Sequence, residues 1–492
     1  MQQKSELLEG WIWTEVKNLG ILINGDRGKN YPSNRHYVDS GIPFINAGNL
    51  FNGKVSTENL NFISDERYNL LNSGKLIEGD IIYCLRGTLG KCAVFSGMKN
   101  GAIASSLVIL RLNEATINSY MYYFLTSPFG KKLIKTFDNG TAQPNLSAKS
   151  LSSYPVPLPP LPEQHRIVAA IEALFARLDA TNERLDKVPE IMKAFRQAVL
   201  MAACDGRLTE DWRLHNSDIE SAKTILEYIT TDKSKLSKKK QTKDAICDVP
   251  YELPTNWCWT CIDLISESMK NGIYKPQEFY SDDGIACLRM YNIDNGAIVW
   301  KNIKRMNLSS EEIAEYLLEP GDILVNRVNS RELVGKAAPI PNGIEACIYE
   351  SKNIRLRVFK QYILSEYIGY WFQVYAQGYF NLNAQQTVNM ASINQQQLAS
   401  MPLPFPPLAE QKEIIFRVSA LFAFADSIES KVIAAKEKTD QLRQSILAKA
   451  FSGELVPTEA ELARQEDRDY ESAEMLLERI KVEGASIKKQ KK

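Results

Sequence analysis

The sequence contains a long internal repeat, and this feature restricts the possible folds more than any other. The stretch LPPLPEQHRI (158–167) aligns with FPPLAEQKEI (405–414) at a spacing of 247 residues (405 − 158). The same spacing places RQAVLMAACDGRL (196–208) on RQSILAKAFSGEL (443–455). Solenoid proteins repeat every ~20–50 residues. A period of this length therefore indicates a duplicated pair of domains and predicts a pseudo-twofold molecule.

The regions upstream of these segments match more loosely, so each half consists of a variable module followed by a nearly identical segment. The looser matches are GWIWTEV (10–16) with NWCWTCI (256–262), IPFINAGNLFNG (42–53) with IACLRMYNIDNG (285–296), and EGDIIYCLRGTLGK (78–91) with PGDILVNRVNSRELVGK (320–336). We expect six segments: a variable module (1–157), a helical segment (158–210), a helix with a Lys-rich linker (211–250), a second module (251–404), a second helical segment (405–456), and a C-terminal helix with a basic tail (457–492).

Each nearly identical segment has an apolar period of 3.5 residues over about five heptads, which is typical of a coiled coil. The seam positions are Ile167, Ile171, Leu174, Leu178, Leu185 and Val199 in the first copy, and Ile414, Val418, Leu421, Ile428, Val432, Leu442 and Ile446 in the second. Because the two seams have similar lengths, we expect the helices to pair with each other, antiparallel. The alternative is that each helix packs only on its own module.

Prolines mark the expected start of the first long helix, and glycines mark the expected ends of both long helices. Five prolines between 155 and 162 exclude a helix interior there and set its start. Gly206 and Gly453 stand where the two helices are expected to end. Pro189 predicts a kink or a break near Val188 in the first copy only.

The modules have the sequence pattern of mixed α/β domains. Short β-like runs are separated by Gly, Asn and Asp, and helical stretches lie near the module ends. The runs are IPFIN, DIIYCL, AVF and SLVILRL in the first module and DILVN and NIRLRV in the second, and the helical stretches are 119–137 and 365–380.

Each half contains a variable module, the motif PPLxEQ and a long heptad helix that ends in RQxxL followed by Gly-Arg/Glu-Leu. This duplicated arrangement resembles the specificity subunit of type I restriction–modification systems. The resemblance covers nearly the whole chain. It implies that each module is a target recognition domain that reads one half of a split sequence in double-stranded DNA. It also implies that an antiparallel coiled coil sets the spacing between the half-sites, since forty helical residues span ~60 Å and one DNA turn is about 34–36 Å.

The resemblance further implies partners and a place for the chemistry. Two copies of an adenine-N6 methyltransferase subunit dock on the helices, and restriction–translocase subunits join them. Together they form a type I site-specific deoxyribonuclease and methyltransferase that defends against foreign DNA. S-adenosylmethionine, ATP and Mg²⁺ are expected on those partners, and this chain is expected to be non-catalytic and to hold no cofactor.

The charge pattern restricts any DNA contact to local patches. The formal net charge is +0. Residues 1–160 carry 16 Lys/Arg against 12 Asp/Glu, and residues 251–405 carry 13 against 16. Basic loops after predicted strands are the best candidates, because Arg can bind guanine bidentately. The candidate DNA-binding residues are Arg27, Lys29, Arg35, Arg86 and Lys91 in the first module and Arg327, Arg331 and Lys336 in the second. The alternative is that these are ordinary surface loops.

The chain lacks the sequence signatures of an enzyme or a metal site. Neither of the phosphate-binding loops G-x-G-x-x-G and G-x-x-x-x-G-K-[ST] is present. The Asn/Asp-Pro-Pro motif of adenine methyltransferases is also missing, because LPPL and FPPL have no Asn or Asp before their prolines. Cys258 and Cys261 form a C-x-x-C without a second pair, so a strand explains them better than zinc. Asn46 and Asn292 are near-equivalent in the repeat and could support loops or meet bases.

The remaining features are ordinary. Eight Cys without framework spacing, no signal pattern and no apolar run of ~20 residues predict a soluble intracellular protein. The resemblance implies the prokaryotic cytoplasm. The Lys-rich segment 232–244 is expected to be a solvated tether. Two other functions stay open: a coiled-coil scaffold that binds proteins but no DNA, and a self-contained methyltransferase, which the missing motifs oppose.

Overall fold

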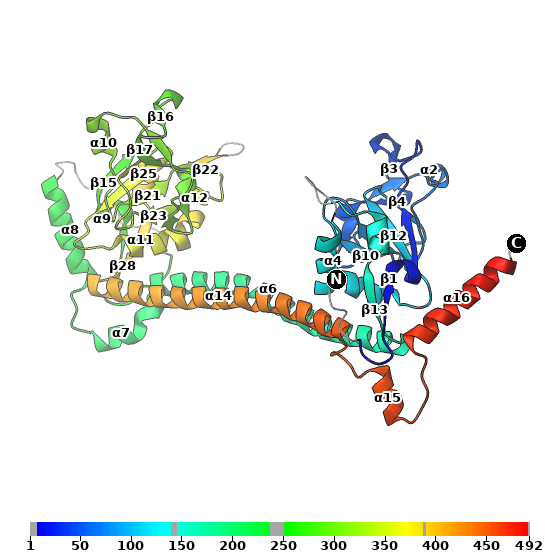
Figure 1. Ribbon diagram of the computed structural model, residues 1–492. Coiled ribbons are helices and arrows are strands. Elements are labelled where there is room, and N and C mark those ends of the chain that lie inside the picture. The colour runs from blue at the N-terminus through cyan, green and yellow to red at the C-terminus, as the bar shows by residue number, and fades with distance from the viewer. Residues whose placement is uncertain (1–6, 139–144, 237–249, 387–389, 491–492) are drawn as a thin grey trace. The chain divides into compact units, whose positions relative to one another are not determined.

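The computed structural model describes residues 7–138, 145–236, 250–386 and 390–490 (Figure 1). It divides into two compact units, each described below by itself. Unit 1 contains Met1–Asp186 and Ile433–Lys492, and unit 2 contains Lys187–Val432. Each unit consists of one module, one half of each long helix and two of the shorter helices that follow the long ones.

In unit 1 the first module is built around a four-stranded sheet and a five-stranded sheet. The four-stranded sheet has the order β10-β9-β12-β2, and its strands are β2 (Gly20–Asn24), β9 (Ile81–Cys84), β10 (Cys92–Val94) and β12 (Leu107–Leu112). The five-stranded sheet has the order β3-β7-β4-β11-β8, and its strands are β3 (Tyr37–Val38), β4 (Ile42–Ile45), β7 (Asn61–Ile63), β8 (Lys75–Leu76) and β11 (Gly101–Ile103).

Short elements complete this module. The helices are α1 (Val16–Leu19), α2 (Asp65–Asn69), α3 (Asn118–Thr126), α4 (Pro128–Phe137) and α5 (Ala148–Ser152), the 3₁₀ turns are η1 (Asn34–His36) and η2 (Ala47–Asn49), and a hairpin joins β5 (Leu50–Phe51) to β6 (Lys54–Val55). The helix expected over 119–137 is thus divided in two, because Pro128 cannot continue α3 and Ser127 caps α4 by accepting from the Gly130 N–H.

In unit 2 the second module repeats this order. Its sheets are β15-β25-β21-β23 and β16-β20-β17-β24, with β15 (Ser266–Asn271), β16 (Tyr280–Ser281), β17 (Ile285–Leu288), β20 (Lys304–Met306), β21 (Ile323–Asn326), β23 (Ala337–Pro339), β24 (Cys347–Tyr349) and β25 (Asn353–Val358). The smaller strands are β18 (Ile293–Asp294), β19 (Ala297–Ile298), β22 (Val328–Asn329), β26 (Gln385–Gln386) and β27 (Ala391–Ser392).

The helices of this module also follow the first copy. They are α9 (Ile262–Ile265), α10 (Ser310–Tyr316), α11 (Ser365–Trp371), α12 (Gln377–Asn383) and α13 (Gln395–Ala399), with a π-helical turn at Phe372–Ala376 and 3₁₀ turns η4 (Gln277–Phe279) and η5 (Met290–Asn292). The strands expected from the sequence lie within a residue or two of β4, β9, β10, β12, β21 and β25.

The first and last strands of each module pair with each other. In unit 1, β1 (Ile12–Glu15) is antiparallel to β13 (Pro155–Leu158). In unit 2, β14 (Cys258–Cys261) is antiparallel to β28 (Pro402–Phe405). This pairing brings both ends of the module to the start of the long helix that follows.

The two predicted long helices are present as α6 (Leu161–Cys204) and α14 (Leu408–Ser452). α6 begins directly after Pro160 and contains Pro162 in its first turn, where proline is tolerated, and α14 begins directly after Pro407. The helices end just before Gly206 and Gly453, both of which adopt positive φ. α6 continues through Pro189, so the predicted break is absent. Pro189 is exposed, which lets water satisfy the helix carbonyl group that loses its partner.

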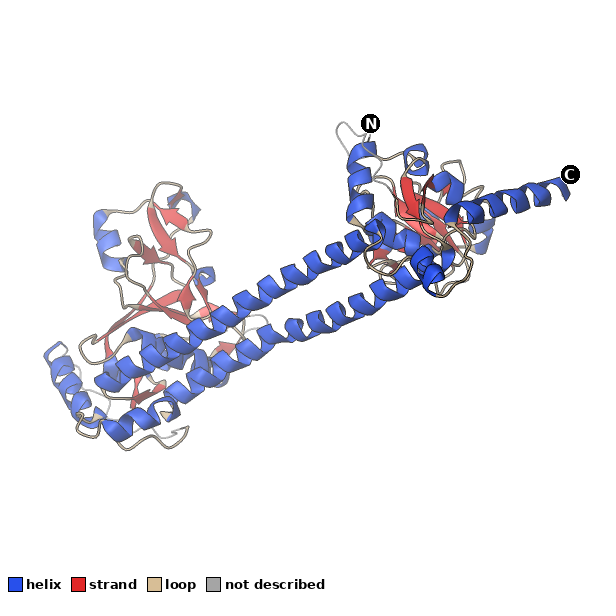
Figure 2. Cartoon of the chain, turned by 60° about the horizontal axis from the view of Figure 1, so that its bottom comes forward, coloured by secondary structure: helices blue, strands red, loops and turns tan. Residues whose placement is uncertain are grey.

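Within each unit the two helices lie side by side and antiparallel (Figure 2). In unit 1, Asp179 pairs with Arg443, and Asp186 pairs with Lys436. In unit 2, the Arg196 guanidinium donates to Glu429 at 2.8 Å. Residue numbers that rise along α6 therefore meet numbers that fall along α14, which confirms the predicted antiparallel coiled coil.

Most predicted seam residues lie on the buried side of these helices. Those buried or partly buried are Ile167, Ile171, Leu174, Leu178, Leu185, Val199, Ile414, Val418, Leu421, Ile428, Val432 and Ile446. Leu442 is a correction, because 43% of it is exposed. Arg443 takes its place, with its guanidinium 4.7 Å from the ring centre of Phe175.

Each module is completed by the end of the helix that belongs to the other copy. In unit 1, Leu447, Ala450 and Phe451 of α14 join the core of the first module, together with Leu476 of α16 (Ala473–Gln490). In unit 2, the core of the second module includes Val199, Leu200, Ala203 and Cys204 from the end of α6 and Ile225 and Ile229 from α8 (Ala222–Leu236).

The segments expected as linker and tail contain further helices. They are α7 (Glu210–His215), α8, α15 (Glu459–Gln465) and α16. The first residues of the Lys-rich segment belong to α8, where Lys233 donates to Asp263, and residues 237–249 lie outside the described residues. In the described part of the chain, no helix combines the length and apolar character that a membrane span needs.

Candidate nucleic-acid interface

In the first module, four strands end at one edge of the fold. β2 and β9 both pair antiparallel with β12, so both end where β12 begins. β4 pairs parallel with β11, whose loop leads into β12. We call the loops that follow these strands strand-end face 1; they are residues 25–31, 46–49, 85–91 and 104–106.

Hydrogen bonds between these loops show that they meet. The Arg27 guanidinium donates to the Ser105 carbonyl oxygen at 3.3 Å, which joins the loops after β2 and β11. The Lys91 ammonium donates to the Ala47 carbonyl oxygen at 2.9 Å, which joins the loops after β9 and β4. Basic side chains from separate stretches of sequence therefore share one surface.

A buried carboxylate fixes the loop that carries Arg27 and Lys29. Asp26 accepts hydrogen bonds from the Gly28 N–H at 2.7 Å and the Asn72 N–H at 2.8 Å. These bonds, that from Gly28 foremost, hold the pKa of Asp26 below its ordinary value. The carboxylate therefore stays ionised at neutral pH, and the loop keeps its shape.

The second module has the same arrangement, which we call strand-end face 2; it contains residues 272–276, 289–292, 327–336 and 350–352. β15 and β21 pair antiparallel with β25, and β17 pairs parallel with β24. The Met290 N–H donates to Glu350 at 3.3 Å, and the Ser351 N–H donates to the Ile273 carbonyl oxygen at 2.8 Å.

The structure brings together four of the five candidates in the first module. Arg27, Lys29 and Arg86 are exposed on strand-end face 1, and Lys91 is partly exposed there. Arg35 lies elsewhere, on η1 before the edge strand β3, and among the described residues no hydrogen bond or ion pair links it to this face. The position of the first four favours a shared role, and Arg35 has no such support.

The three candidate residues in the second module differ in whether their charged groups already contact other protein groups. Arg331 is exposed and forms no ion pair with any described residue. The Arg327 guanidinium donates to the Ser351 and Ile393 carbonyl oxygens at 3.3 and 3.4 Å. The Lys336 ammonium nitrogen lies 3.6 Å from a carboxylate oxygen of Asp294. Arg331 is therefore the best placed of the three to meet a ligand.

The structure supports the ungapped alignment of the two copies from Gly79 and Gly321 onward. The Leu85 N–H donates to Ser106 as the Arg327 N–H donates to Lys352, so buried Leu85 is the counterpart of Arg327. Arg86 therefore corresponds to the following residue, Val328.

The predicted near-equivalence of Asn46 and Asn292, by contrast, is wrong. Asn292 is buried at the end of a 3₁₀ turn and accepts from the Arg289 N–H at 2.9 Å. Asn49 does the same for the Asn46 N–H at 3.0 Å. Asn292 thus matches Asn49, and Asn46 matches Arg289.

Strand-end face 2 presents aromatic residues that the sequence reasoning missed. Tyr274 and Tyr291 are 79% and 68% exposed. The guanidinium of Arg289 lies 5.5 Å from the ring centre of Tyr291. Tyr274 stands directly before Lys275 and Tyr291 two residues after Arg289, so tyrosines beside basic residues were the available signal.

Two residues of the PPLxEQ motif attach each module to its helix. Glu163 accepts from the Trp11 indole N–H at 2.8 Å, and Glu410 accepts from that of Trp257 at 2.7 Å. The Gln164 side chain accepts from the Ile117 N–H and donates to the Ala115 carbonyl oxygen. The Gln411 side chain likewise accepts from the Leu364 N–H and donates to the Tyr362 carbonyl oxygen. All four motif side chains are buried. The motif is therefore an anchor, a role that its prolines alone did not suggest.

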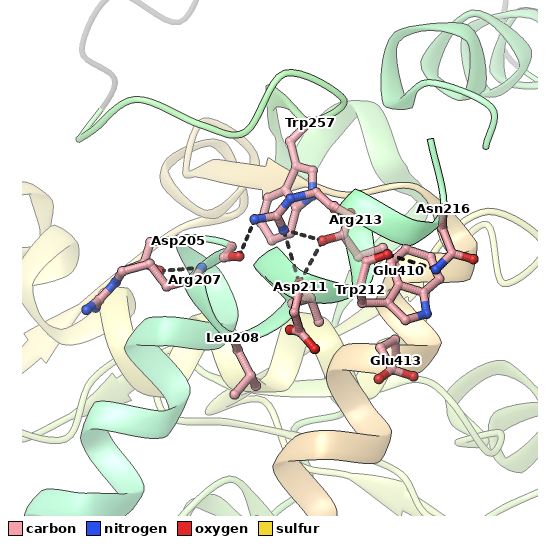
Figure 3. A network of polar contacts seen from close by, with 12 residues as sticks. Asp205, Arg207, Leu208, Asp211, Trp212, Arg213, Asn216, Trp257, Glu410 and Glu413 are labelled. Carbon is pink, nitrogen blue, oxygen red and sulfur yellow. Dashed lines mark hydrogen bonds and ion pairs between the residues drawn. The ribbon is translucent and has the colours of Figure 1, made fainter. Parts of the chain in front are cut away.

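In each unit this anchor also holds the segment from the other copy. In unit 2, Glu410 accepts from the Thr209 hydroxyl at 2.7 Å and pairs with Arg213 of α7 (Figure 3). In unit 1, the Glu459 N–H donates to Glu163 at 2.9 Å. Burial raises the pKa of Glu163, and these hydrogen bonds offset the shift only in part.

The Gly-Asp pair that precedes β9 and β21 (Gly79-Asp80 and Gly321-Asp322) ties each of these strands to its neighbour, β12 or β25. Asp80 accepts two hydrogen bonds from Arg111, both at 2.8 Å, and Asp322 accepts two from Arg357, both at 2.7 Å. Such bidentate pairs are strong and directional. They stabilise the sheets at the end opposite to the strand-end faces.

The described residues include no group of three or more His, Cys, Asp or Glu side chains suited to a metal ion. Cys258 and Cys261 are the first and last residues of strand β14, as the sequence predicted. Burial raises the pKa of Cys258 to about 11, so this thiol is protonated at neutral pH.

Comparison with known proteins gives a consistent result. The model of the type I restriction modification DNA specificity domain matches residues 12–190 and 270–437. The chain is 30% identical to the type I restriction enzyme EcoKI specificity subunit of Escherichia coli K12, covering 98% of this chain and 97% of that protein. It is also 30% identical to the StySPI specificity subunit of Salmonella potsdam, with the same coverage.

Solved structures share the fold. A chain from work on complex assembly and conformational transition of the type I R-M system gives a TM-score of 0.59 at 18% identity, covering 91% of this chain and 99% of that chain. The HsdS subunit of Thermoanaerobacter tengcongensis gives 0.53 at 17% identity, with 92% and 99% covered. With two matching domains, a relative similar over its whole length and this anchored helical pair, the chain belongs to the type I restriction–modification DNA specificity subunit family.

Proposed function

We propose that the chain is the sequence-reading subunit of a type I restriction–modification complex, and that each strand-end face reads one half of a bipartite site in duplex DNA. The observation that carries this proposal is the repeated gathering of four loops, with basic or aromatic side chains, at one edge of each module. Base edges are read by a few such side chains, while phosphate contacts set the register.

The helical pair serves the spacing and the assembly in this proposal. α6 and α14 each contribute to both units, so the two modules share continuous helices. This continuity supports a fixed number of base pairs between the half-sites. Two methyltransferase subunits and the restriction–translocase subunits bind alongside, and the complex works in the prokaryotic cytoplasm, where its DNA is.

The chain itself is non-catalytic in this proposal. S-adenosylmethionine, ATP and Mg²⁺ then belong to the partner subunits, and what the described residues contribute is binding and orientation. A coiled-coil scaffold without DNA binding is the alternative. Selection of bound sequences from random duplex DNA, with the methyltransferase partner present, separates the two, because a scaffold would enrich no split consensus.

Truncation of one arginine on each face tests the assignment of half-sites. We expect Arg86→Ala and Arg331→Ala each to weaken binding by about 1–3 kcal/mol, the usual value of a specific Arg contact. The loss should fall on opposite halves of the site for the two variants, measured by footprinting and by base preference. Arg35→Ala is the control. Equal effects on both halves, or none, would show that these loops do not read bases.

An exposed aromatic pair on α14 is suited to a protein partner. Phe416 and Phe424 are 70% and 58% exposed on a helix whose other side is buried in the pair. Exposed apolar residues on such a helix favour an interface. We expect Phe424→Ala to weaken methyltransferase binding about tenfold or more in titration calorimetry, while free Phe424→Ala keeps the wild-type melting temperature. Unchanged affinity would place the partner elsewhere.

A further inference from the structure

The loop after β21 is longer than its counterpart in the first module. The Cys84 N–H donates to the Lys91 carbonyl, and the Asn326 N–H donates to the Lys336 carbonyl at 2.7 Å, so these bonds bracket equivalent loops. The enclosed residues are 85–90 and 327–335, six positions against nine. The longer loop contains a turn in which the Val334 N–H donates to the Ser330 carbonyl at 3.0 Å, and this turn presents exposed Arg331.

Three buried asparagines hold the start of this longer loop. The Asn329 amide donates to the Asn326 side-chain oxygen at 2.8 Å, and the Asn326 amide donates to the Asn353 side-chain oxygen at 3.1 Å. Asn329 in turn accepts from the Ser330 N–H at 2.8 Å. Asn326 and Asn353 have no exposed surface, and Asn329 has 6%.

The network joins several parts of strand-end face 2. Asn326 is the last residue of β21, and Asn353 is the first residue of β25. The Asn353 amide also reaches the Leu288 carbonyl oxygen at the end of β17, at 3.5 Å. The three side chains therefore fix the loop relative to the ends of the neighbouring strands.

The first module lacks this device. β9 and β12 pair Cys84 with Leu107 at the position where β21 and β25 pair Asn326 with Asn353. The Cys84 thiol donates to the Arg86 carbonyl oxygen in the loop that directly follows, at 3.0 Å. A buried amide network is strongly directional, and leaving one of its groups unpaired costs about 1–3 kcal/mol. Polar side chains at these buried positions thus fix a geometry that apolar ones do not.

We infer that Asn326, Asn329 and Asn353 are positioning residues that hold Arg331 in the orientation with which the second module reads its half-site. This inference rests on the proposed DNA-reading function. The two modules then differ: recognition of the second half-site depends on a buried amide network, and recognition of the first half-site does not. Loss of the network should relax base preference at one half-site and leave binding to random duplex DNA unchanged.

The test compares base preference among variants of the full chain bound to its methyltransferase partner. Asn329→Ala removes the donor to Asn326 and the acceptor for Ser330. A second variant, Asn326→Cys with Asn353→Leu, copies the apolar pair of the first module and avoids a cavity. Sequences are selected from a random duplex library, and affinity for unselected duplex and thermal melting are measured alongside. Arg331→Ala identifies which half belongs to the second module.

We expect both network variants to reduce discrimination about tenfold at the half-site that Arg331→Ala affects, the factor that corresponds to ~1.4 kcal/mol. The other half and the affinity for unselected duplex should stay as in the wild type. Wild-type preference at both halves in the paired variant would overturn the inference and leave the proposed function intact. Equal loss at both halves would also overturn it, since it would indicate general unfolding. If the wild type selects no split sequence, the proposed function itself fails.

Discussion

Glu410→Ala is expected to destabilise unit 2 by about 3–5 kcal/mol, the usual cost of breaking a buried ion pair by removing one partner. The Glu410 side chain is fully buried and serves the Trp257 indole, the Thr209 hydroxyl and Arg213 together. Truncation leaves the Arg213 guanidinium, with 15% of its side chain exposed, without its counter-charge.

Hydrogen exchange of the full chain is the suitable measurement, because a protein of two units need not unfold in one step. Protection should fall in peptides from α7 and from β14, with unit 1 unchanged. Glu410→Gln keeps an acceptor for Trp257 and should cost less. Asp426→Ala removes a carboxylate that is 71% exposed from the same helix, and should cost below ~1 kcal/mol. Similar losses in Glu410→Ala and Asp426→Ala would contradict the anchoring role.

Phe451→Ala is expected to cost unit 1 about 3–5 kcal/mol, the usual range for Phe→Ala in a core. Phe451, at the end of α14, is 3% exposed. Its ring centre lies 5.2 Å from that of Tyr120 and 5.5 Å from that of Phe124, both in edge-on contact. Truncation therefore opens a cavity between the first module and a helix that follows the second.

The readout is urea unfolding followed by hydrogen exchange in α3 and in the last turns of α14. Both should lose protection together, because they share the cavity. Phe424→Ala is the matched control: the same residue type on the same helix, but largely exposed. If α3 keeps its protection in Phe451→Ala, the end of α14 does not belong to the core of the first module.

The helical framework could be predicted from sequence because its determinants are local. Prolines and glycines fix where α6 and α14 begin and end, and the apolar period fixes which side is buried. The prediction fails at Leu442, although the next position of the series, Ile446, again lies on the buried side. In place of Leu442, Arg443 covers Phe175 with its guanidinium and pairs with Asp179, which a hydrophobic pattern cannot indicate.

The candidate interface was less predictable, because it depends on contacts between distant loops. Basic residues after strands pointed to Arg27 and Arg86, and strand pairing places both at one edge. Tyr274 and Tyr291 were missed, since an exposed tyrosine looks like a buried one in sequence. The ungapped start of the aligned motifs already places Leu85 on Arg327, and backbone hydrogen bonds confirm this correspondence and show that the loop in the second module is three residues longer.

The composition of the two units has a consequence for synthesis on the ribosome. Unit 2 is one continuous stretch, Lys187–Val432, whereas unit 1 combines the first residues of the chain with the last. Domains generally fold as their residues emerge. The first module to leave the ribosome must therefore wait for Leu447, Phe451 and Leu476 to close its core, while the module made later can be complete already. The module that is synthesised first therefore completes its fold last, and a chain truncated before α14 ends would have a first module with an incomplete core.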